Sequence, residues 1–595
     1  MATQISVLPP RVRLLPVFAV AAVIAALTCF GAFVLPFFFP PTHPTYGAAY
    51  TAGFNNGVAT IATTLISVLT LYLTWRFDLF PRQFTSEYEA HIPMWLLAIS
   101  IALCTAFTGG LGWMLCKAEL GSADIRFFLE SMDDVIRYHE HIYTDFSFNY
   151  GPLLLYYPVW IHRLLQPLHF SLEGSYFVAL AIAEALGQVL LYFTLESLPI
   201  SKDVKLVTFL AFTVIAMCPV LGMNYTFIRF LVPFSTLLFA TRTRKPLHLA
   251  LVFFLGELLQ LAISPEMGMA FGAGACFYGV SQWRQKEALW VLAVAAPPLA
   301  GGIFLTISGR SYLHSITKFS NGTGNLVIEP LGYILLFLLA VVWLIPQMLA
   351  ARFKRDQSDA TLMASLFVLS IWLLPPALGR CDLLHVFFNG AGMYLLASVA
   401  ISSYPRAIRQ LWFLFLSCSV TWMQIVNFYV RPDFALAPKV IHSPSLRNDS
   451  IDIERLEAIT GAEKVATPFL LPWRVEMQLK QSGNYAPDQE SDYISHDAES
   501  ETARLHRMDT YNWALIPLAD ALKKETLVNT SGFLGIGYSF YPERRKPYIY
   551  GLILTKDLET SWTSTAIFGQ WELYRHNPSN LPLSPTALAL HSQLP

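Results

Sequence analysis

Apolar runs separated by short polar loops fill the chain up to about residue 430. A helix needs about 20 mostly apolar residues to cross a lipid bilayer, and most of these runs approach or exceed that length. The pattern therefore predicts an α-helical polytopic membrane protein with about thirteen spans. The predicted spans are residues 14–39, 56–75, 93–116, 174–198, 205–222, 227–240, 246–264, 267–282, 287–307, 331–350, 360–378, 386–403 and 409–429.

The first run, 14–39, is too long for the apolar part of a signal peptide, which covers about 7–15 residues. No small-x-small cleavage site follows it. We therefore expect it to remain in the protein as the first span.

Basic residues cluster in alternate loops, and such loops face the cytoplasm under the positive-inside rule. The clusters are Arg11/Arg13, Arg76/Arg82, Arg242/Arg244/Lys245, Arg284/Lys286, Arg352/Lys354/Arg355 and Arg406/Arg409. We expect a multi-pass protein of the inner (plasma) membrane with a cytoplasmic N-terminus. The predicted outer segments are 40–55, 117–173, 223–226, 265–266, 308–330, 379–385 and everything after about residue 430.

This orientation requires that the apolar stretch 151–168 does not cross the membrane. The stretch contains Pro152, Pro158, His162 and Arg163, which fit a helix at an interface better than a helix in lipid. We expect an amphipathic or re-entrant helix at the outer surface.

The chain changes character at about residue 431. The tail contains charged clusters and short aromatic-rich stretches typical of strands, at 548–554 and 571–575, with an acidic polar segment at 488–502. The sequence therefore predicts two parts: a transmembrane domain, 1–430, with an outer loop 117–173, and a C-terminal periplasmic or extracellular α/β domain, 431–595.

Composition supports a membrane protein and argues against a nucleic-acid-binding one. Of the 595 residues 54% are hydrophobic and only 14% are charged, against about 25% charged in a soluble domain. The net charge of -1 offers no basic excess to neutralise nucleic-acid phosphates. The seven cysteines form no CxxC pair, so we interpret them as small packing residues.

Acidic and aromatic residues gather in the predicted outer loop 117–173. Asp124 follows the third predicted span by a few residues, where a lipid headgroup would lie. It precedes YTDF at 143–146 and YGPL at 150–153, which leads into the predicted interfacial helix. Two further outer segments carry charge: SPEMG at 264–268 and GRCDLLH at 379–385.

The order of these motifs resembles the outer loops of the GT-C glycosyltransferases. These polytopic enzymes, such as protein mannosyltransferases and lipid A aminoarabinose transferases, use a polyprenyl-phosphate sugar as donor. The resemblance covers roughly residues 90–430. It implies a GT-C-like bundle that moves a sugar, with inversion, to a lipid, glycan or protein acceptor at the outer face of the membrane.

The chain departs from the usual family pattern in two respects. Its acidic loop follows the third predicted span, whereas in most members it follows the first. The family's adjacent pair of carboxylates is absent, because Asp124 stands between Ala123 and Ile125. Asp145 or Glu266 would have to complete the pair.

Transfer from a phosphate-linked sugar needs a base, and Asp124 is the candidate. It also needs positive charge or a divalent cation at the departing phosphate, and a groove for the polyprenyl chain. Arg380 and His385 are candidates for the phosphate, with Arg229 as a further one. Asp382 and Tyr150 complete the predicted site. The alternative for Arg380 is an interfacial cation in contact with water, and for His385 an ordinary residue at a helix end.

Two other classes of function fit parts of the sequence. Glu184 and Glu257 fall inside predicted spans, as carboxylates on ion pathways do, so the chain could be a transporter or a flippase for lipid-linked sugars. It could also be an assembly or sensor protein that acts through its C-terminal domain.

Overall fold

The structure is a computed structural model. It describes residues 14–41, 49, 52–79, 91–117, 123–146, 148–219, 221–243, 245–283, 288–319, 325–355, 357–425, 451–467, 473–483, 485–486, 506, 508–517, 560–569 and 571–577.

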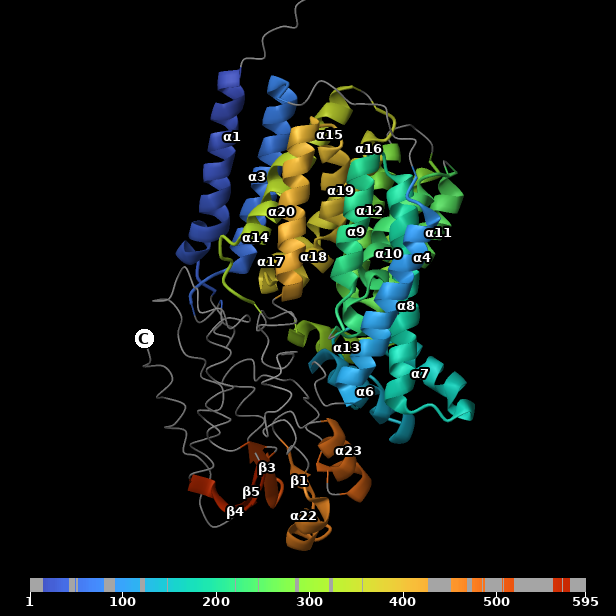
Figure 1. The fold of residues 1–595 in the computed structure, drawn as a ribbon, viewed down its shortest axis with the longest axis vertical. Coiled ribbons are helices and arrows are strands. Elements are labelled where there is room, and N and C mark those ends of the chain that lie inside the picture. Colours follow the sequence, from blue (N-terminus) through green and yellow to red (C-terminus); the bar gives the residue numbers. More distant parts are fainter. Residues whose placement is uncertain are drawn as a thin grey trace, which may run out of the picture.

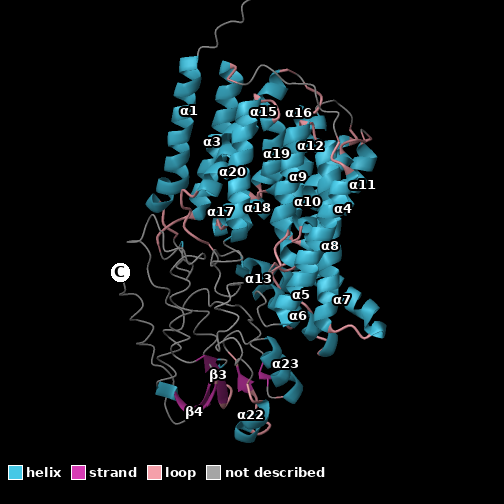
Figure 2. Ribbon diagram, viewed as in Figure 1, coloured by secondary structure: helices cyan, strands magenta, loops and turns pink. Residues whose placement is uncertain are grey.

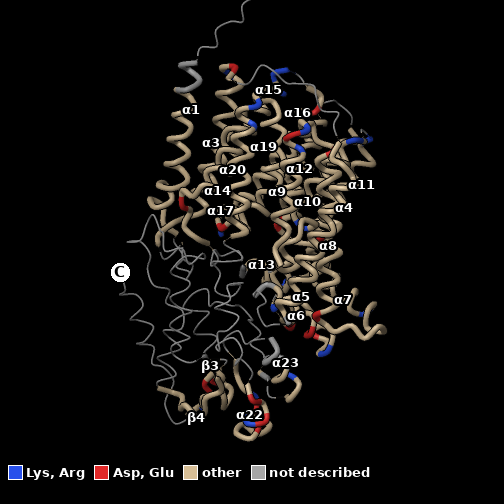
Figure 3. The backbone as a smooth tube through the Cα atoms, viewed as in Figure 1, with Lys and Arg blue, Asp and Glu red and all other residues tan. Residues whose placement is uncertain are grey.

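Long helices packed side by side form a bundle, and a small region of mixed helix and strand lies beyond one end of it (Figures 1 and 2). Charged residues are concentrated near the two ends of the bundle, and its middle is mostly uncharged (Figure 3). This distribution is the one expected of a helical bundle in a lipid bilayer.

Nine helices in the described residues are long and apolar enough to cross a membrane. The number rises to ten if α18 (Leu383–Asn389) and α19 (Ala391–Ile401), bent by 67° at their junction, count as one span. The nine are Ala19–Phe38, Asn56–Phe77, Met94–Cys116, Leu172–Ser197, Met223–Ala240, Pro246–Ile263, Trp290–Thr317, Gly332–Lys354 and Ala360–Arg380.

These spans are built from the following helices: α1 (Leu14–Cys29), α3 (Asn56–Phe77), α4 (Met94–Cys104), α5 (Gly112–Lys117), α8 (Leu172–Ser197), α10 (Phe227–Ala240), α11 (Pro246–Ile263), α13 (Trp290–Phe319), α14 (Gly332–Leu339), α15 (Ile345–Lys354), α16 (Ala360–Ile371) and α17 (Leu374–Arg380).

The predicted number of thirteen spans was too high by this measure. Three predicted segments form helices of the bundle that are not candidate spans: α9 (Lys202–Ala216), α12 (Pro265–Trp283) and α20 (Arg406–Ile425). α9 has only 15 residues, because the apolar run continues into a loop after Ala216. α12 is rich in glycine, and α20 contains two arginines and two glutamines, so neither is apolar enough over its length to count as a candidate span.

Hydrogen bonds and ion pairs gather the predicted cytoplasmic loops at one end of the bundle. Lys354 pairs with Asp78, which joins the ends of α15 and α3. Arg409 lies 2.9 Å from Asp203, and the backbone N–H of Ser201 donates to Ser402 Oγ at 3.0 Å.

The predicted outer loops are gathered at the other end in the same way. The N–H of Ala49 donates to the carbonyl of Asn325 at 3.0 Å, and the N–H of Leu326 to that of Gly379 at 2.8 Å. The N–H of Gly151 donates to the carbonyl of Ile263 at 3.0 Å. The two sets of loops therefore separate as the positive-inside pattern predicts, and the C-terminal region lies at the outer-loop end (Figure 1).

The loop after the third span forms two helices at this end. α6 (Ala123–Arg137) is amphipathic, and its apolar face, which includes Ile125, Phe128 and Met132, is fully buried. α7 (Pro152–Leu165) has 14 residues, a length of about 21 Å that falls short of the ~30 Å hydrocarbon layer. α7 is thus too short to cross, in agreement with an interfacial helix.

A five-stranded sheet of order β2-β1-β3-β5-β4 forms the core of the C-terminal region. β1 (Val465–Ala466) is parallel to β2 (Tyr485–Ala486) and β3 (Trp513–Pro517). β5 (Trp571–His576) pairs antiparallel with β3 and with β4 (Trp562–Phe568). Together with α22 (Ile453–Thr460) and α23 (Trp473–Ser482), these strands confirm the mixed character of the tail. β5 contains the predicted strand 571–575, whereas 548–554 and 488–502 lie outside the described residues.

The C-terminal region contacts the outer loop through one helix. Lys480 of α23 forms an ion pair with Asp134 of α6, and its ammonium lies 5.5 Å from the centre of the Tyr138 ring. Both charged side chains of the pair are largely buried. The C-terminal region is therefore joined to α6, the helix whose second residue is Asp124.

Candidate functional site

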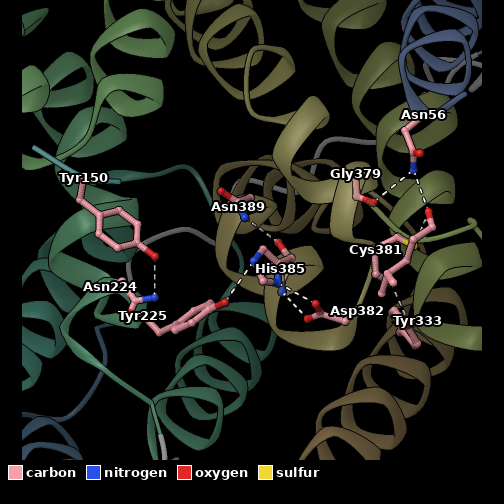
Figure 4. Close-up of polar contacts among 11 residues, drawn as sticks. Asn56, Tyr150, Asn224, Tyr225, Tyr333, Gly379, Cys381, Asp382, His385 and Asn389 are labelled. Atoms are coloured by element: carbon pink, nitrogen blue, oxygen red, sulfur yellow. Dashed lines mark hydrogen bonds and ion pairs between the residues drawn. The ribbon is translucent and has the colours of Figure 1, made fainter. Parts of the chain in front are cut away.

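Two clusters of polar side chains lie at the outer-loop end of the bundle, and one short turn joins them. The turn, η5 (Met223–Tyr225), directs Asn224 toward Tyr150 on one side and Tyr225 toward His385 on the other (Figure 4).

The first cluster is centred on His385, near the start of α18. Its Nδ1 lies 2.7 Å from Asp382 Oδ2, and its Nε2 lies 3.1 Å from the hydroxyl of Tyr225. Asn389, one turn further along α18, donates its amide to the His385 carbonyl at 3.1 Å. Because the carboxylate accepts from one ring nitrogen, the imidazole is oriented with the other nitrogen toward Tyr225.

The backbone around Asp382 is fixed by three other elements. Cys381 adopts a left-handed conformation with φ 36° at the end of α17, and its carbonyl accepts the Tyr333 hydroxyl at 2.9 Å. Asn56, the first residue of α3, donates to the carbonyls of Leu378 and Gly379 at 2.9 and 3.1 Å (Figure 4). Asp382 then caps α18 by accepting the N–H of His385.

Asp382 is almost fully buried, yet its surroundings favour the ionised form of its carboxyl group. Burial raises its pKa, but the adjacent His385 imidazole and the Arg380 guanidinium lower it more, so the pKa of Asp382 falls below its ordinary value. An ionised Asp382 accepts the hydrogen bond that orients the imidazole.

The second cluster is centred on Arg229 of α10. Its guanidinium pairs with Glu266 of α12, donates to Ser264 Oγ at 3.2 Å and donates to the carbonyl of Asn224 at 2.6 Å. It also lies 4.7 Å from the centre of the Tyr150 ring, within the range of a cation–π interaction. Arg229 thus joins α10, α12 and the loop before α7.

Tyr150 itself is held at both ends. Its hydroxyl accepts the Asn224 amide at 2.9 Å, and its carbonyl accepts the hydroxyl of Tyr143 at 2.6 Å. Burial raises the pKa of Tyr143, so this hydroxyl remains a hydrogen-bond donor. Tyr143 of YTDF and Tyr150 of YGPL therefore fix the shape of the loop that leads into α7.

Two predicted site residues lie at the edge of these clusters or outside them. Arg380 is exposed at the last position of α17, close enough to lower the pKa of Asp382. Asp145 is exposed and accepts the backbone N–H of His141 at 2.7 Å, which makes it the cap of its own turn. The structure gives Asp145 a local role in the loop and no contact with Glu266 or His385.

Asp124 is the second residue of α6, and its side chain lies outside the described residues. The structure therefore brings together Tyr150, Arg229, Glu266, Asp382 and His385, and it leaves the role of Asp124 as a prediction.

Sequence reasoning missed Tyr225, Asn224 and Ser264. The signal for the first two was the polar pair itself, which stands in the predicted outer loop 223–226 between two apolar runs. Ser264 belongs to the SPEMG motif, but the motif drew attention only to its glutamate.

The described residues contain no group of three or more histidine, cysteine, aspartate or glutamate side chains that could hold a metal ion. The basic side chains found at the two clusters are those of Arg229, Arg380 and His385.

The fold defines an integral, multi-pass helical membrane protein. Models of known protein families give no match to the chain, and no curated protein matches it significantly. The two clusters are thus the basis for any assignment of function.

Proposed function

We propose that the protein is a membrane glycosyltransferase that moves a sugar from a polyprenyl-phosphate donor to a lipid, glycan or protein acceptor at the outer face of the inner membrane. The observation that carries the proposal is the convergence of Tyr150, Arg229, Glu266, Asp382 and His385 from four distant segments. They meet at the end of the bundle where the amphipathic α6 and the short α7 lie (Figure 1).

The donor phosphate would lie against His385 and Arg380. Asp382 orients the imidazole, whose ring N–H groups can donate to a phosphate oxygen, and Arg380 offers an exposed guanidinium a few residues away. Together they would offset the charge that develops on the departing lipid phosphate.

The acceptor hydroxyl would lose its proton to Asp124, with Glu266 as the second carboxylate. Glu266 is engaged by Arg229, so its free lone pairs are fewer than those of a solvated carboxylate. We therefore assign Glu266 to positioning of the site and keep Asp124 as the base. Asp145, as a local cap, becomes the weaker candidate for the partner.

The C-terminal region would influence the choice of acceptor, because α23 is anchored to α6 by Lys480 and Asp134. Deletion after about residue 435 is expected to change which acceptors are used. Equal transfer to every acceptor by the truncated chain would remove this part of the proposal.

The test is transfer of a labelled sugar from a polyprenyl-phosphate donor in membranes that contain matched amounts of each variant. Arg380→Ala should raise the KM for the donor and lower kcat, and Arg380→Lys should recover only part, because a planar fork is replaced by a point charge. Arg163→Ala, a change at another exposed arginine of the same end, is the control. Wild-type kinetics in Arg380→Ala would contradict the proposed phosphate site.

A transporter or flippase is the second candidate, because Glu184 and Glu257 are buried inside spans and each has one oxygen without a partner among the described residues. The two functions separate in sealed vesicles. A transporter would move the lipid-linked sugar between leaflets without breaking the sugar–phosphate bond, whereas a transferase would release the free lipid phosphate.

A further inference from the structure

Three polar side chains line one face of α11 below the Arg229 cluster. Ser264 directly follows α11, Gln260 lies four residues before it, and Glu257 three residues before that. Residues at this spacing share one face of a helix. All three are buried, with exposed fractions of 0% for Ser264 and Gln260 and 5% for Glu257.

Most of the polar atoms on this face lack partners. Gln260 has neither a donor for its Oε1 nor an acceptor for its Nε2 among the described residues, and the Oε2 of Glu257 is also without a partner there. A buried amide or carboxyl group without hydrogen bonds costs several kcal/mol in a membrane. Such atoms on successive turns of one helix indicate that they bind a small polar ligand.

α12 packs closely against the carboxyl group of Glu257. A β-carbon built on Gly272 of α12 would lie 3.1 Å from Glu257 Oε2 and 3.3 Å from Oε1. Glycine at this position therefore lets α12 approach the carboxyl group closely. Cys276 follows one turn later on α12, and its thiol donates to the Val294 carbonyl at 3.5 Å.

No cation among the described residues contacts Glu257. On the helices packed against α11, Arg229 pairs with Glu266, the Tyr312 hydroxyl lies 3.5 Å from the Leu261 carbonyl, and His162 bonds to Ser175. The other titratable side chains described on these helices and on α11 itself are exposed or pack elsewhere: Tyr156, Tyr157, Arg163, His248, Tyr278, Arg310 and His314. An unpaired carboxylate is far more costly in a membrane than a neutral acid. Glu257 is therefore expected to carry a proton.

The polar face begins at the candidate site. Ser264 Oγ accepts a hydrogen bond from Arg229, which in turn pairs with Glu266. Polar groups thus run from Glu266 at the surface cluster to Glu257 inside the membrane.

We propose that α10, α11 and α12 enclose a hydrated proton-binding site that runs from Ser264 to Glu257. Glu257 is the neutral acid that holds the proton, and Gln260 binds the water that connects it to the Arg229–Glu266 pair. The site exchanges protons with water at the outer-loop end. It does not depend on the transferase reaction.

Infrared spectroscopy of the full chain in lipid nanodiscs tests the proposal. At neutral pH the difference between wild type and Glu257→Gln should contain the carbonyl band of one protonated carboxyl group. When H2O is replaced by D2O, the carboxyl proton should exchange for deuterium within the time of mixing, and the band should shift. Gln260→Leu keeps a similar volume but removes both amide atoms, and it should slow the shift by about tenfold or more.

Glu184 is the matched control. It is 2% exposed inside α8, and its band, obtained from Glu184→Gln, should shift much more slowly. On its face of α8 the side chains toward the outer-loop end are the apolar Leu180 and Phe177, and Gln188, whose Nε2 lacks a partner among the described residues, lies in the opposite direction. Absence of a protonated band for Glu257 would overturn the proposal, as would a band that does not shift in D2O or whose shift is unchanged in Gln260→Leu. If Glu257→Gln does not fold, Glu257→Asp keeps the acid and should move the band instead. Sugar transfer enters none of these measurements, so their failure leaves the proposed transferase untouched.

Discussion

Asp382 holds His385 through both carboxylate oxygens: Oδ2 lies 2.7 Å from Nδ1, and Oδ1 accepts the backbone N–H at 3.0 Å. One side chain therefore caps α18 and orients the imidazole at its start. The two roles can be separated, because asparagine is as good an N-cap as aspartate but carries no charge.

We expect Asp382→Asn to leave the fold intact and to lower sugar transfer by about 10–100-fold, since a hydrogen bond to a charged group contributes about 1.5–3 kcal/mol. Asp382→Ala should lower transfer similarly and also reduce the melting temperature, because the cap is lost. Transfer assays paired with thermal unfolding in detergent measure both effects. Equal transfer by Asp382→Asn and wild type would show that the carboxylate is structural only.

The Arg229–Glu266 pair gives a second prediction. Glu266→Gln leaves the 9% exposed Arg229 side chain without its counter-charge. We expect the free energy of unfolding to fall by about 2–4 kcal/mol. This lies toward the lower end of the effect of breaking a buried ion pair, because the Glu266 side chain is 22% exposed. Arg229→Met combined with Glu266→Gln should recover most of it, because the unpaired charge is removed.

The control for this pair is Arg409–Asp203 at the opposite end of the bundle, where the Asp203 side chain is 42% exposed. Asp203→Asn should cost less than about 1 kcal/mol. Denaturant unfolding of the wild type and the three variants gives the comparison, and a double variant no more stable than Glu266→Gln would contradict the pairing.

His162 predicts how stability depends on pH. It is buried in α7 with Nδ1 3.0 Å from Ser175 Oγ, and burial together with the charge of Arg137 lowers its pKa. The unfolded chain therefore binds a proton more readily than the folded one, so the stability contribution is complete above the ordinary histidine pKa of ~6.5 and is lost as the pH falls below it.

We expect wild type to lose stability relative to His162→Gln when the pH is lowered from about 8 to about 5. Thermal unfolding at each pH measures the difference. His169→Gln, a change at an exposed histidine that follows α7, should run parallel to wild type. A constant difference between wild type and His162→Gln over this range would be incompatible with a buried neutral imidazole.

Which loops share an end of the bundle was predictable from the sequence, because charged residues avoid lipid and their loops alternate along the chain. The bend at Gly390 was not. The predicted span 386–403 contains no proline, but a β-carbon on Gly390 would lie 2.2 Å from the Val386 carbonyl and 2.6 Å from the Phe337 ring. At the bend, Gly390 lies against a helix more than fifty residues away, and hydropathy contains no information about such contacts.

The candidate site was predictable in part for the same reason. Motifs with charge, such as SPEMG and GRCDLLH, stand out against apolar neighbours, so Glu266, Asp382 and His385 could be found. Tyr225 is one aromatic residue among many, and only the three-dimensional contact with His385 distinguishes it. Asp145 attracted attention as a carboxylate in a conspicuous motif, yet its side chain stabilises a turn.

The link between α23 and α6 predicts that the C-terminal region loosens when one charge is reversed. Lys480→Glu places a second carboxylate beside Asp134, in a contact where both side chains are largely buried. Hydrogen exchange of α23 should become about tenfold faster or more, because about 1.4 kcal/mol corresponds to a factor of ten. The swapped variant Asp134→Lys/Lys480→Glu should restore slow exchange. Unchanged exchange in Lys480→Glu would mean that the ion pair does not anchor the region.

The last prediction concerns the base. Asp124 is the second residue of an amphipathic helix at the outer-loop end, close to the end of the third span. A lipid-linked donor and an acceptor in water can both reach this position, and a carboxylate there can act as a base only in its ionised form. Asp124→Asn retains the shape but removes the proton acceptor, so transfer should fall by about 10²–10⁴-fold with little change in the KM for the donor.

Asp145→Asn is the matched control, because asparagine can still accept the N–H of His141 and the structure gives Asp145 only this local role. Its transfer rate should stay within about threefold of wild type, as for a surface change of less than ~0.7 kcal/mol. The assay follows a labelled sugar from the polyprenyl-phosphate donor at matched expression. Full activity in Asp124→Asn would remove Asp124 as the base, and a large loss in Asp145→Asn would transfer that role to the YTDF loop.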